Sequence, residues 1–191
     1  MIKFLNDETV AGYRYGKGSI ATLDAATEAA LIATADAMTY PAVTKPVEVL
    51  SSSAVAVSCA LTASDEVLAS FTIAAGTLGA NSIIQIEPLW TFASSANNKI
   101  CKIKIASATV YSATRTTSVK EGPLIVLANR NSLASQIQPY DNTYVTAGSG
   151  APATYTVDFS VNVTVQITGQ RANSGDALTL EYYRVLHFVG D

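Results

Sequence analysis

The sequence predicts an all-β protein: an antiparallel β-sandwich or jelly roll, preceded by an N-terminal extended arm and a short helix. Three observations indicate this. Short apolar strips with an alternating pattern recur from Val47 onward, turn residues separate them, and no helical period lies between them. The 191 residues suit one domain and an appendage. We therefore expect an attachment segment at 1–46 and a jelly-roll domain at 47–191.

The first 46 residues differ in pattern from the rest. Glycines at positions 12, 16 and 18 interrupt the first stretch, which has no steady period and is predicted to be an extended arm. The stretch LDAATEAALIATADAM (23–38) then predicts a helix. Asp24 suits its N-cap, and Glu28 lies in the first turns, where the helix dipole favours negative charge. Pro41 and Pro46 end the helix and mark a linker.

The strands are predicted from nine strips that are separated by turn sequences such as AGTLGANS, SSANN, KEGP and QRANSGD. The strips are VEVL, AVAVSCALT, VLASFTI, SIIQIEPLWTF, KICKIKI, TVYSATRTT, PLIVLAN, TYTVDFSVNVTVQIT and ALTLEYYRVLHFV. Within FSVNVTVQITG (159–169), every second residue is apolar. One face is therefore predicted to meet the core or a subunit interface, through Phe159, Val161, Val163, Val165 and Ile167. The turn NSGD (173–176) is predicted to be a hairpin or near-hairpin.

The composition limits the possible partners. Charged residues make up 14% of the chain, against about 25% in ordinary soluble domains. Neutral surface of this kind tends to associate, so we expect an oligomer. A net charge of −3 and scattered lysines and arginines argue against nucleic-acid binding. Lys102 and Lys104 are interpreted as a solvated strand face rather than a phosphate contact. We find no stretch long enough to span a membrane and no signal peptide, so we expect a soluble protein that is made in a cytoplasm.

Residues able to do chemistry are few. His187 is the only histidine and is predicted to be a terminal-strand residue rather than a general base. Cys59 and Cys101 lack metal or redox spacing and are predicted to be buried free thiols. Asp65 and Glu66 are interpreted as a solvated corner rather than a calcium site. Trp90 is predicted to fill the core or an interface rather than to stack on a sugar. We therefore predict no catalytic residue, no metal and no cofactor.

Two segments resemble a known family. FTIAAGTLGANSIIQIEPLWTFASSANNKICKIKI (71–105) and VNVTVQITGQRANSGDALTLEYYRVL (161–186) resemble jelly-roll modules of tailed-bacteriophage virion proteins. The match is carried by Ala75 to Asn81, Trp90, Ser95 to Lys99 and Leu178 to Tyr182. It spans most of 67–189. The resemblance implies a capsid decoration, head-fibre or tail-fibre protein, which is usually a homotrimer. Because the chain lacks long shaft repeats, we favour a protein that is bound to the head over a tail fibre.

Three functions are compatible with these observations. The first is a capsid decoration or cement protein on the virion surface that binds the major capsid protein through its N-terminal arm. The attachment residues would be Phe4, Leu5, Tyr13, Tyr15, Leu31 and Ile32. The second is a tail-fibre or receptor-binding module whose loops, such as 137–154, contact host glycans. The third is a carbohydrate-active enzyme, since paired carboxylates can lie far apart in sequence. We favour the first, although the helix could instead pack on its own sandwich or on a neighbouring subunit.

Overall fold

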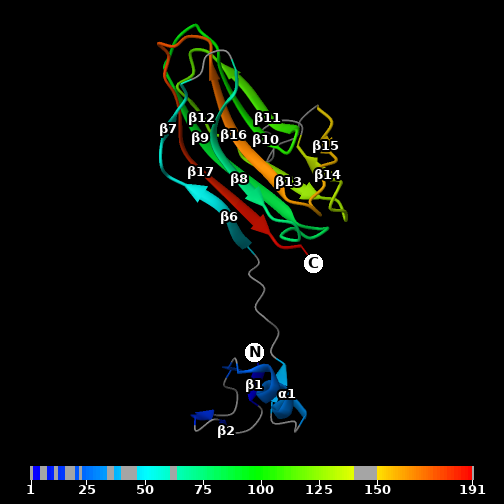
Figure 1. Ribbon diagram of the computed structural model, residues 1–191. Coiled ribbons are helices and arrows are strands. Elements are labelled where there is room, and N and C mark those ends of the chain that lie inside the picture. Colours follow the sequence, from blue (N-terminus) through cyan, green and yellow to red (C-terminus); the bar gives the residue numbers. More distant parts are fainter. Residues whose placement is uncertain are drawn as a thin grey trace. The chain divides into compact units, whose positions relative to one another are not determined.

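The computed structural model describes residues 2–4, 8–10, 13–15, 20–21, 23–33, 37–39, 47–60, 64–139 and 150–190. The chain forms two compact units, residues 1–44 and residues 45–191. The first unit contains the helix α1 and short strands, and the second contains the long strands of a β-sandwich (Figure 1).

Short antiparallel strand pairs build the first unit together with one helix. Strand β1 lies between β4 and β5, and β2 pairs with β3. The predicted arm therefore contains paired strands. The elements are β1 (Ile2–Phe4), β2 (Glu8–Val10), β3 (Tyr13–Tyr15), β4 (Ile20–Ala21), α1 (Ala25–Ala33) and β5 (Ala37–Thr39).

The start of α1 is capped as the sequence predicts. The Oδ1 atom of Asp24 accepts a hydrogen bond from the Thr27 N–H at 3.0 Å, and Oε1 of Glu28 accepts one from the Leu23 N–H at 2.9 Å. The helix ends at Ala33 and is shorter than the predicted stretch 23–38. Met38 lies instead in β5, opposite Lys3 of β1. The last residues of the predicted stretch pair with β1 instead of extending the helix, because so short a helix gains little stability by itself.

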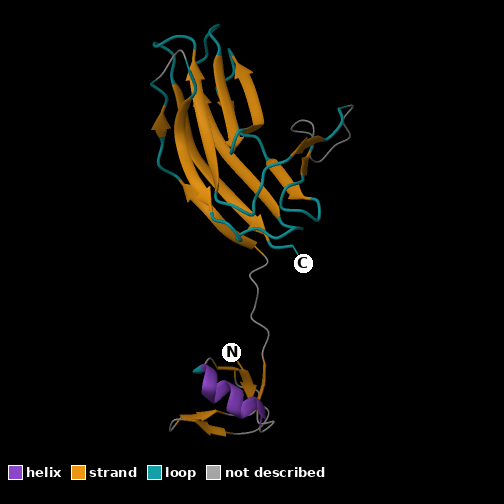
Figure 2. Cartoon of the chain, turned by 45° about the vertical axis from the view of Figure 1, so that its right-hand side comes forward, coloured by secondary structure: helices purple, strands orange, loops and turns teal. Residues whose placement is uncertain are grey.

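The second unit is a sandwich of two antiparallel sheets (Figure 2). The larger sheet has the order β15-β14-β13-β9-β17-β6, with β12 beside β9 and β7 beside β17; the smaller sheet has the order β11-β10-β16-β8. The strands are β6 (Val47–Ser53), β7 (Val57–Ser58), β8 (Glu66–Ile73), β9 (Ile83–Phe92), β10 (Lys99–Ile105), β11 (Ala108–Arg115), β12 (Lys120–Glu121), β13 (Ile125–Asn129), β14 (Gln136–Gln138), β15 (Ala153–Tyr155), β16 (Val163–Arg171) and β17 (Leu178–Phe188).

The core lies between the sheets and is supplied by alternate residues of the long strands. Burial alternates along the whole of β9, which contributes Ile84, Ile86 and Trp90, and along β10, which contributes Ile103 and Ile105. Because successive side chains of a strand point to opposite faces, each strip forms one core face and one outer face. Trp90 is fully buried, which confirms its predicted place in the core.

The structure confirms an all-β antiparallel sandwich but shortens one predicted strand. Strand β16 begins at Val163, whereas the alternating pattern starts at Phe159. The carboxylate of Asp158 accepts a hydrogen bond from the Ser160 N–H at 2.8 Å and closes a tight turn there. Phe159 still enters the core, but Val161 is 55% exposed. Val161 therefore does not face the core, and that part of the prediction is wrong.

The turn NSGD is tight, but it does not join two paired strands. The Asn173 Oδ1 atom accepts the Gly175 N–H at 2.8 Å, and its carbonyl accepts the Asp176 N–H at 3.1 Å. The strand before the turn, β16, pairs with β10 and β8, whereas the strand after it, β17, pairs with β9, β6 and β7. The turn thus carries the chain from one sheet to the other, which corrects the predicted hairpin.

Candidate functional site

The residues predicted to attach the protein to a capsid lie in the first unit. Phe4 is in β1, Tyr13 and Tyr15 are in β3, Leu31 and Ile32 are in α1, and Leu5 lies outside the described residues. The structure separates the two helix residues. Leu31 is half-buried and belongs to a small apolar cluster with Val10, Ala21 and Leu23. Ile32 is 40% exposed, so it is the member of this pair that is available to a partner.

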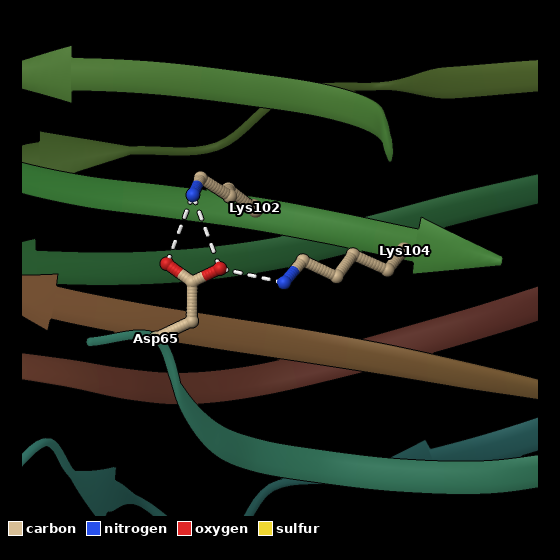
Figure 3. Close-up of polar contacts among 3 residues, drawn as sticks. All are labelled: Asp65, Lys102 and Lys104. Atoms are coloured by element: carbon tan, nitrogen blue, oxygen red, sulfur yellow. Dashed lines mark hydrogen bonds and ion pairs between the residues drawn. The ribbon is translucent and has the colours of Figure 1, made fainter. Parts of the chain in front are cut away.

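One ion-pair cluster joins residues that the sequence analysis treated separately. It contains Lys102 and Lys104, which were predicted to form a solvated strand face, and Asp65 of the predicted solvated corner. Asp65 precedes β8 and reaches across β16 to two lysines of β10 (Figure 3). Lys102 Nζ lies 2.9 Å from Oδ1, and Lys104 Nζ lies 2.6 Å from Oδ2. Partial burial raises the pKa of Asp65, but hydrogen bonds from Lys104 and Lys102 outweigh it and leave that pKa below its usual value. The cluster joins the start of β8 to β10 across β16.

His187 joins a serine and a glutamate in the order of a catalytic triad. Its Nε2 atom lies 2.8 Å from the Ser82 Oγ, and its Nδ1 atom lies 3.4 Å from the Glu48 Oε2. Ser82 is nevertheless buried, and its hydroxyl already accepts the Gly79 N–H at 2.8 Å. A nucleophile must be reachable by substrate, so this arrangement holds the 79–82 turn against β17 and β6. The sequence gives no signal for it, because Ser82 and His187 lie 105 residues apart.

Lys99 is a second polar group that the sandwich buries completely. Its Nζ atom donates to the Ser95 Oγ at 2.8 Å, and that hydroxyl donates to the Asp176 carboxylate at 2.9 Å. The chain of contacts joins the 93–98 turn to the turn after β16. A buried polar group requires such partners, and these contacts stabilise the end of the sandwich.

The remaining reactive groups have structural positions. Cys59 and Cys101 are buried and are not joined in a disulfide, as predicted, and burial raises the pKa of Cys101. Among the described residues, no group of three or more His, Cys, Asp and Glu side chains is placed to hold a metal ion. No helix in the described part of the chain is long and apolar enough to cross a membrane.

The outer face of the larger sheet is apolar over several neighbouring strands. Cross-strand partners share a face, so the pairings of Val47 with Phe188, Phe188 with Ile83, and Ile83 with Ala128 place one apolar row across four strands. A second row lies beside it. We call the following residues the outer face: Val47, Val49, Ile83, Gln85, Val126, Ala128, Ile137, Leu186 and Phe188, all of which are exposed or half-buried.

A cleft opens between the sheets along β11. Its volume is about 450 Å³, and its walls come from β11, from β13, and from the facing parts of β14 and β15. The polar side chains that line it include Thr109, Arg115, Gln138 and Tyr155. Sequence reasoning missed this cleft because its walls come from four separate segments that only the folded sandwich brings together.

The fold and these contacts define an all-β sandwich protein in which the buried His187 and Lys99 make structural contacts. The described surface of the sandwich includes an apolar sheet face and a cleft. No family model matches the sequence, and none of the curated proteins matches it. The solved structures with a similar arrangement include the CBM2 module of the evolved Dit of Lactobacillus casei BL23 phage J-1. It is 12% identical with a TM-score of 0.31, and the match covers 64% of this chain and 70% of that one.

Two similar structures come from infectious bursal disease virus. The structure of the Gt strain is 11% identical with a TM-score of 0.30, and the match covers 78% of this chain and 43% of that one. The VP2 subviral particle is 10% identical with a TM-score of 0.31, and the match covers 78% of this chain and 42% of that one. The match thus spans less than half of each of these viral chains.

Proposed function

We propose that this protein is a non-enzymatic structural protein of a bacteriophage virion, a capsid decoration or cement protein that assembles as a homotrimer on the capsid surface. The observation that carries the proposal is the apolar outer face of the larger sheet. A contiguous apolar row across neighbouring strands suits a face that another protein covers, and a second copy of the chain is the partner proposed here. The resemblance of 71–105 and 161–186 to phage virion modules supports the assignment to a virion.

The position and charge of the outer face suit contacts between copies. At a spacing of ~4.8 Å, the strands β13, β9, β17 and β6 span about 19 Å, and the two rows cover about 10 Å along each strand, so the face offers on the order of 200 Å². Stable interfaces bury about 800 Å² per partner, so the proposed interface also takes in the surface around these rows. The charged residues next to this face, Arg184 and Glu87, pair with each other. Covering the face would leave neither charge without a partner.

The first unit is proposed to be the attachment segment that binds the major capsid protein. It leaves Ile20 and Ile32 exposed, at 46% and 40%. Apolar side chains on so small a unit would gain stability from a partner surface. The sandwich would then stand on the capsid through residues 1–46.

Self-assembly is tested with two matched valines. Val49 is on the outer face and 62% exposed, whereas Val161 is off this face and 55% exposed. Both can become lysine without burying a charge. We expect the wild-type chain and Val161→Lys to have a solution mass near three times 20.0 kDa, and Val49→Lys to dissociate, as measured by light scattering. A trimeric Val49→Lys, or a monomeric wild type, would contradict the proposed interface.

Attachment is tested on capsids of the phage that encodes the protein, stripped of this chain. Removing residues 1–44 should leave a folded oligomer that no longer binds, as measured by cosedimentation. Ile32→Asp should weaken binding, whereas Ala30→Asp, an exposed position two residues earlier on α1, should bind normally. Full occupancy by the shortened chain would place the attachment in the sandwich. Copy number separates this function from a tail-fibre module, because decoration requires many copies per capsid.

A further inference from the structure

We propose that the cleft between β11 and strands β13 to β15 binds a neutral saccharide. This inference does not depend on where the protein sits on a particle. The volume of about 450 Å³ lies within the range of small-molecule sites, ~300–1,000 Å³. The walls combine apolar side chains with hydroxyl, amide and phenol groups, which is the mixture that a polyhydroxylated ring contacts.

Gln138 fixes the orientation of the Tyr155 hydroxyl at this cleft. The Gln138 Nε2 donates to the Val110 carbonyl at 2.7 Å and to the Tyr155 hydroxyl oxygen at 2.9 Å. A carbonyl can only accept, so the contact with Val110 identifies the amide nitrogen. The Oε1 atom of the same amide is buried and has no hydrogen-bond partner among the described residues. Gln138 itself is 8% exposed.

The open hydrogen-bonding groups of the cleft suit an alcohol. The Tyr155 oxygen accepts from Gln138, so its own proton remains available to an acceptor. The hydroxyl groups of Thr109 and Ser112 also line the cleft. A sugar hydroxyl both donates and accepts and therefore suits this mixture, whereas a carboxylate or phosphate only accepts. The lining therefore favours a hydroxyl-bearing ligand.

The electrostatics of the cleft favour a ligand without charge. Arg115 is the charged residue that lines it, and its Nε and Nη2 atoms both donate to the Glu121 carboxylate. Glu121 also accepts the hydroxyl of Tyr111. Since Glu121 compensates the charge of Arg115, an anion would gain little there. Tyr111 stacks on Trp90 at a centroid distance of 6.3 Å, so the single tryptophan of the chain reports on the cleft wall.

The test uses the full chain and methyl α-pyranosides of glucose, galactose, mannose and N-acetylglucosamine. Saturation-transfer NMR and Trp90 fluorescence should detect at least one of them. Tyr155→Phe removes the available donor and should weaken its affinity about tenfold. Tyr182→Phe changes an exposed tyrosine on β17 and should leave the affinity unchanged. The disaccharides maltose, cellobiose and lactose are measured as well. Tighter binding of a disaccharide than of the monosaccharide glycosides would indicate that the cleft binds a glycan chain, whereas equal affinities would indicate that it binds a single sugar.

Four outcomes would overturn the proposal. The first is the absence of saturation transfer to all four glycosides at millimolar concentration. The second is an affinity that Tyr155→Phe leaves unchanged. The third is tighter binding of inorganic phosphate than of any glycoside, which would mean that the cleft selects charge. Loss of binding in Tyr182→Phe as well would likewise point away from the cleft.

Discussion

Two buried polar residues of this sandwich belong to hydrogen-bonded chains that reach residues distant in sequence. Lys99 bonds to a serine that itself bonds to Asp176, and His187 bonds to Ser82. Buried groups of this kind stabilise a fold only when their partners are present. At the surface, by contrast, Asp65 is held by two half-buried lysines. Each of these residues has a structural partner, and this gives predictions at the residue scale.

Asp65→Asn should lower the free energy of unfolding at pH 7 by about 1 kcal/mol, the upper range for a partly exposed ion pair. The pKa of Asp65 is lowered in the folded state. Its contribution is therefore complete above the unfolded pKa of about 3.9 and is lost as the pH falls through the lower folded value. Urea unfolding from pH 7 to pH 2 should show the wild type and the variant converging in acid. A constant difference at all pH values would assign the effect to packing instead.

The thiols of Cys59 and Cys101 should not react with a disulfide reagent in the native protein at pH 8. Both are buried, and burial raises the pKa of Cys101, while only the thiolate reacts. Both thiols should be titrated once the chain is unfolded in guanidinium. Ser112→Cys, at an exposed position of β11, gives a positive control that reacts at once. Rapid native labelling of Cys101 would contradict its burial.

At the scale of elements, local hydrogen bonds decide where helices and strands begin. Asp24 and Glu28 fix the start of α1, and the turn at Asp158 delays β16 until Val163. A side chain that bonds to the backbone two or three residues away competes with regular structure. The alternation of FSVNVTVQITG therefore predicts the strand correctly only after this turn.

Replacing the helix cap should make α1 fray. Hydrogen bonds from Thr27 lower the pKa of Asp24, so the charged cap acts above the ordinary pKa of about 3.9 and is lost as the pH falls through the lower folded value. Asp24→Ala should speed amide hydrogen exchange at Thr27 near pH 7. Asp24→Asn keeps the acceptor and should exchange nearly as slowly as the wild type. Equal exchange in all three proteins would mean that packing alone orders the first turn.

For the whole molecule, the sandwich has a core of its own. The buried apolar residues of that core run from Cys59, just after β7, to Val185 in β17. A chain beginning at Val47 should therefore show the circular dichroism of a β protein. It should melt within about 3 °C of the full chain, because 1 kcal/mol moves the melting temperature by about 2–4 °C at this size. Substantial helix in that chain, or a much lower melting temperature, would contradict an independent sandwich.

The sequence by itself determined the fold class, the N-cap at Asp24, the buried thiols and the burial of Trp90. These features follow from local periodicity and residue type, since an alternating strip has an apolar face wherever it lies. The same rule applies to the neighbouring residues Tyr182 and Tyr183 of β17, which point to opposite faces. Tyr182 is exposed, and Tyr183 packs against the core and stacks on Phe71.

Only the tertiary structure decided which strands pair and what they bring together. The turn NSGD gives no sign that β16 and β17 lie in opposite sheets. The apolar rows of the outer face depend on the register between strands, and the contact of His187 with Ser82 and the cleft beside Gln138 depend on segments far apart in the chain. Such features arise from non-local pairing, for which local pattern carries no information because the same alternating strip fits either sheet and several registers.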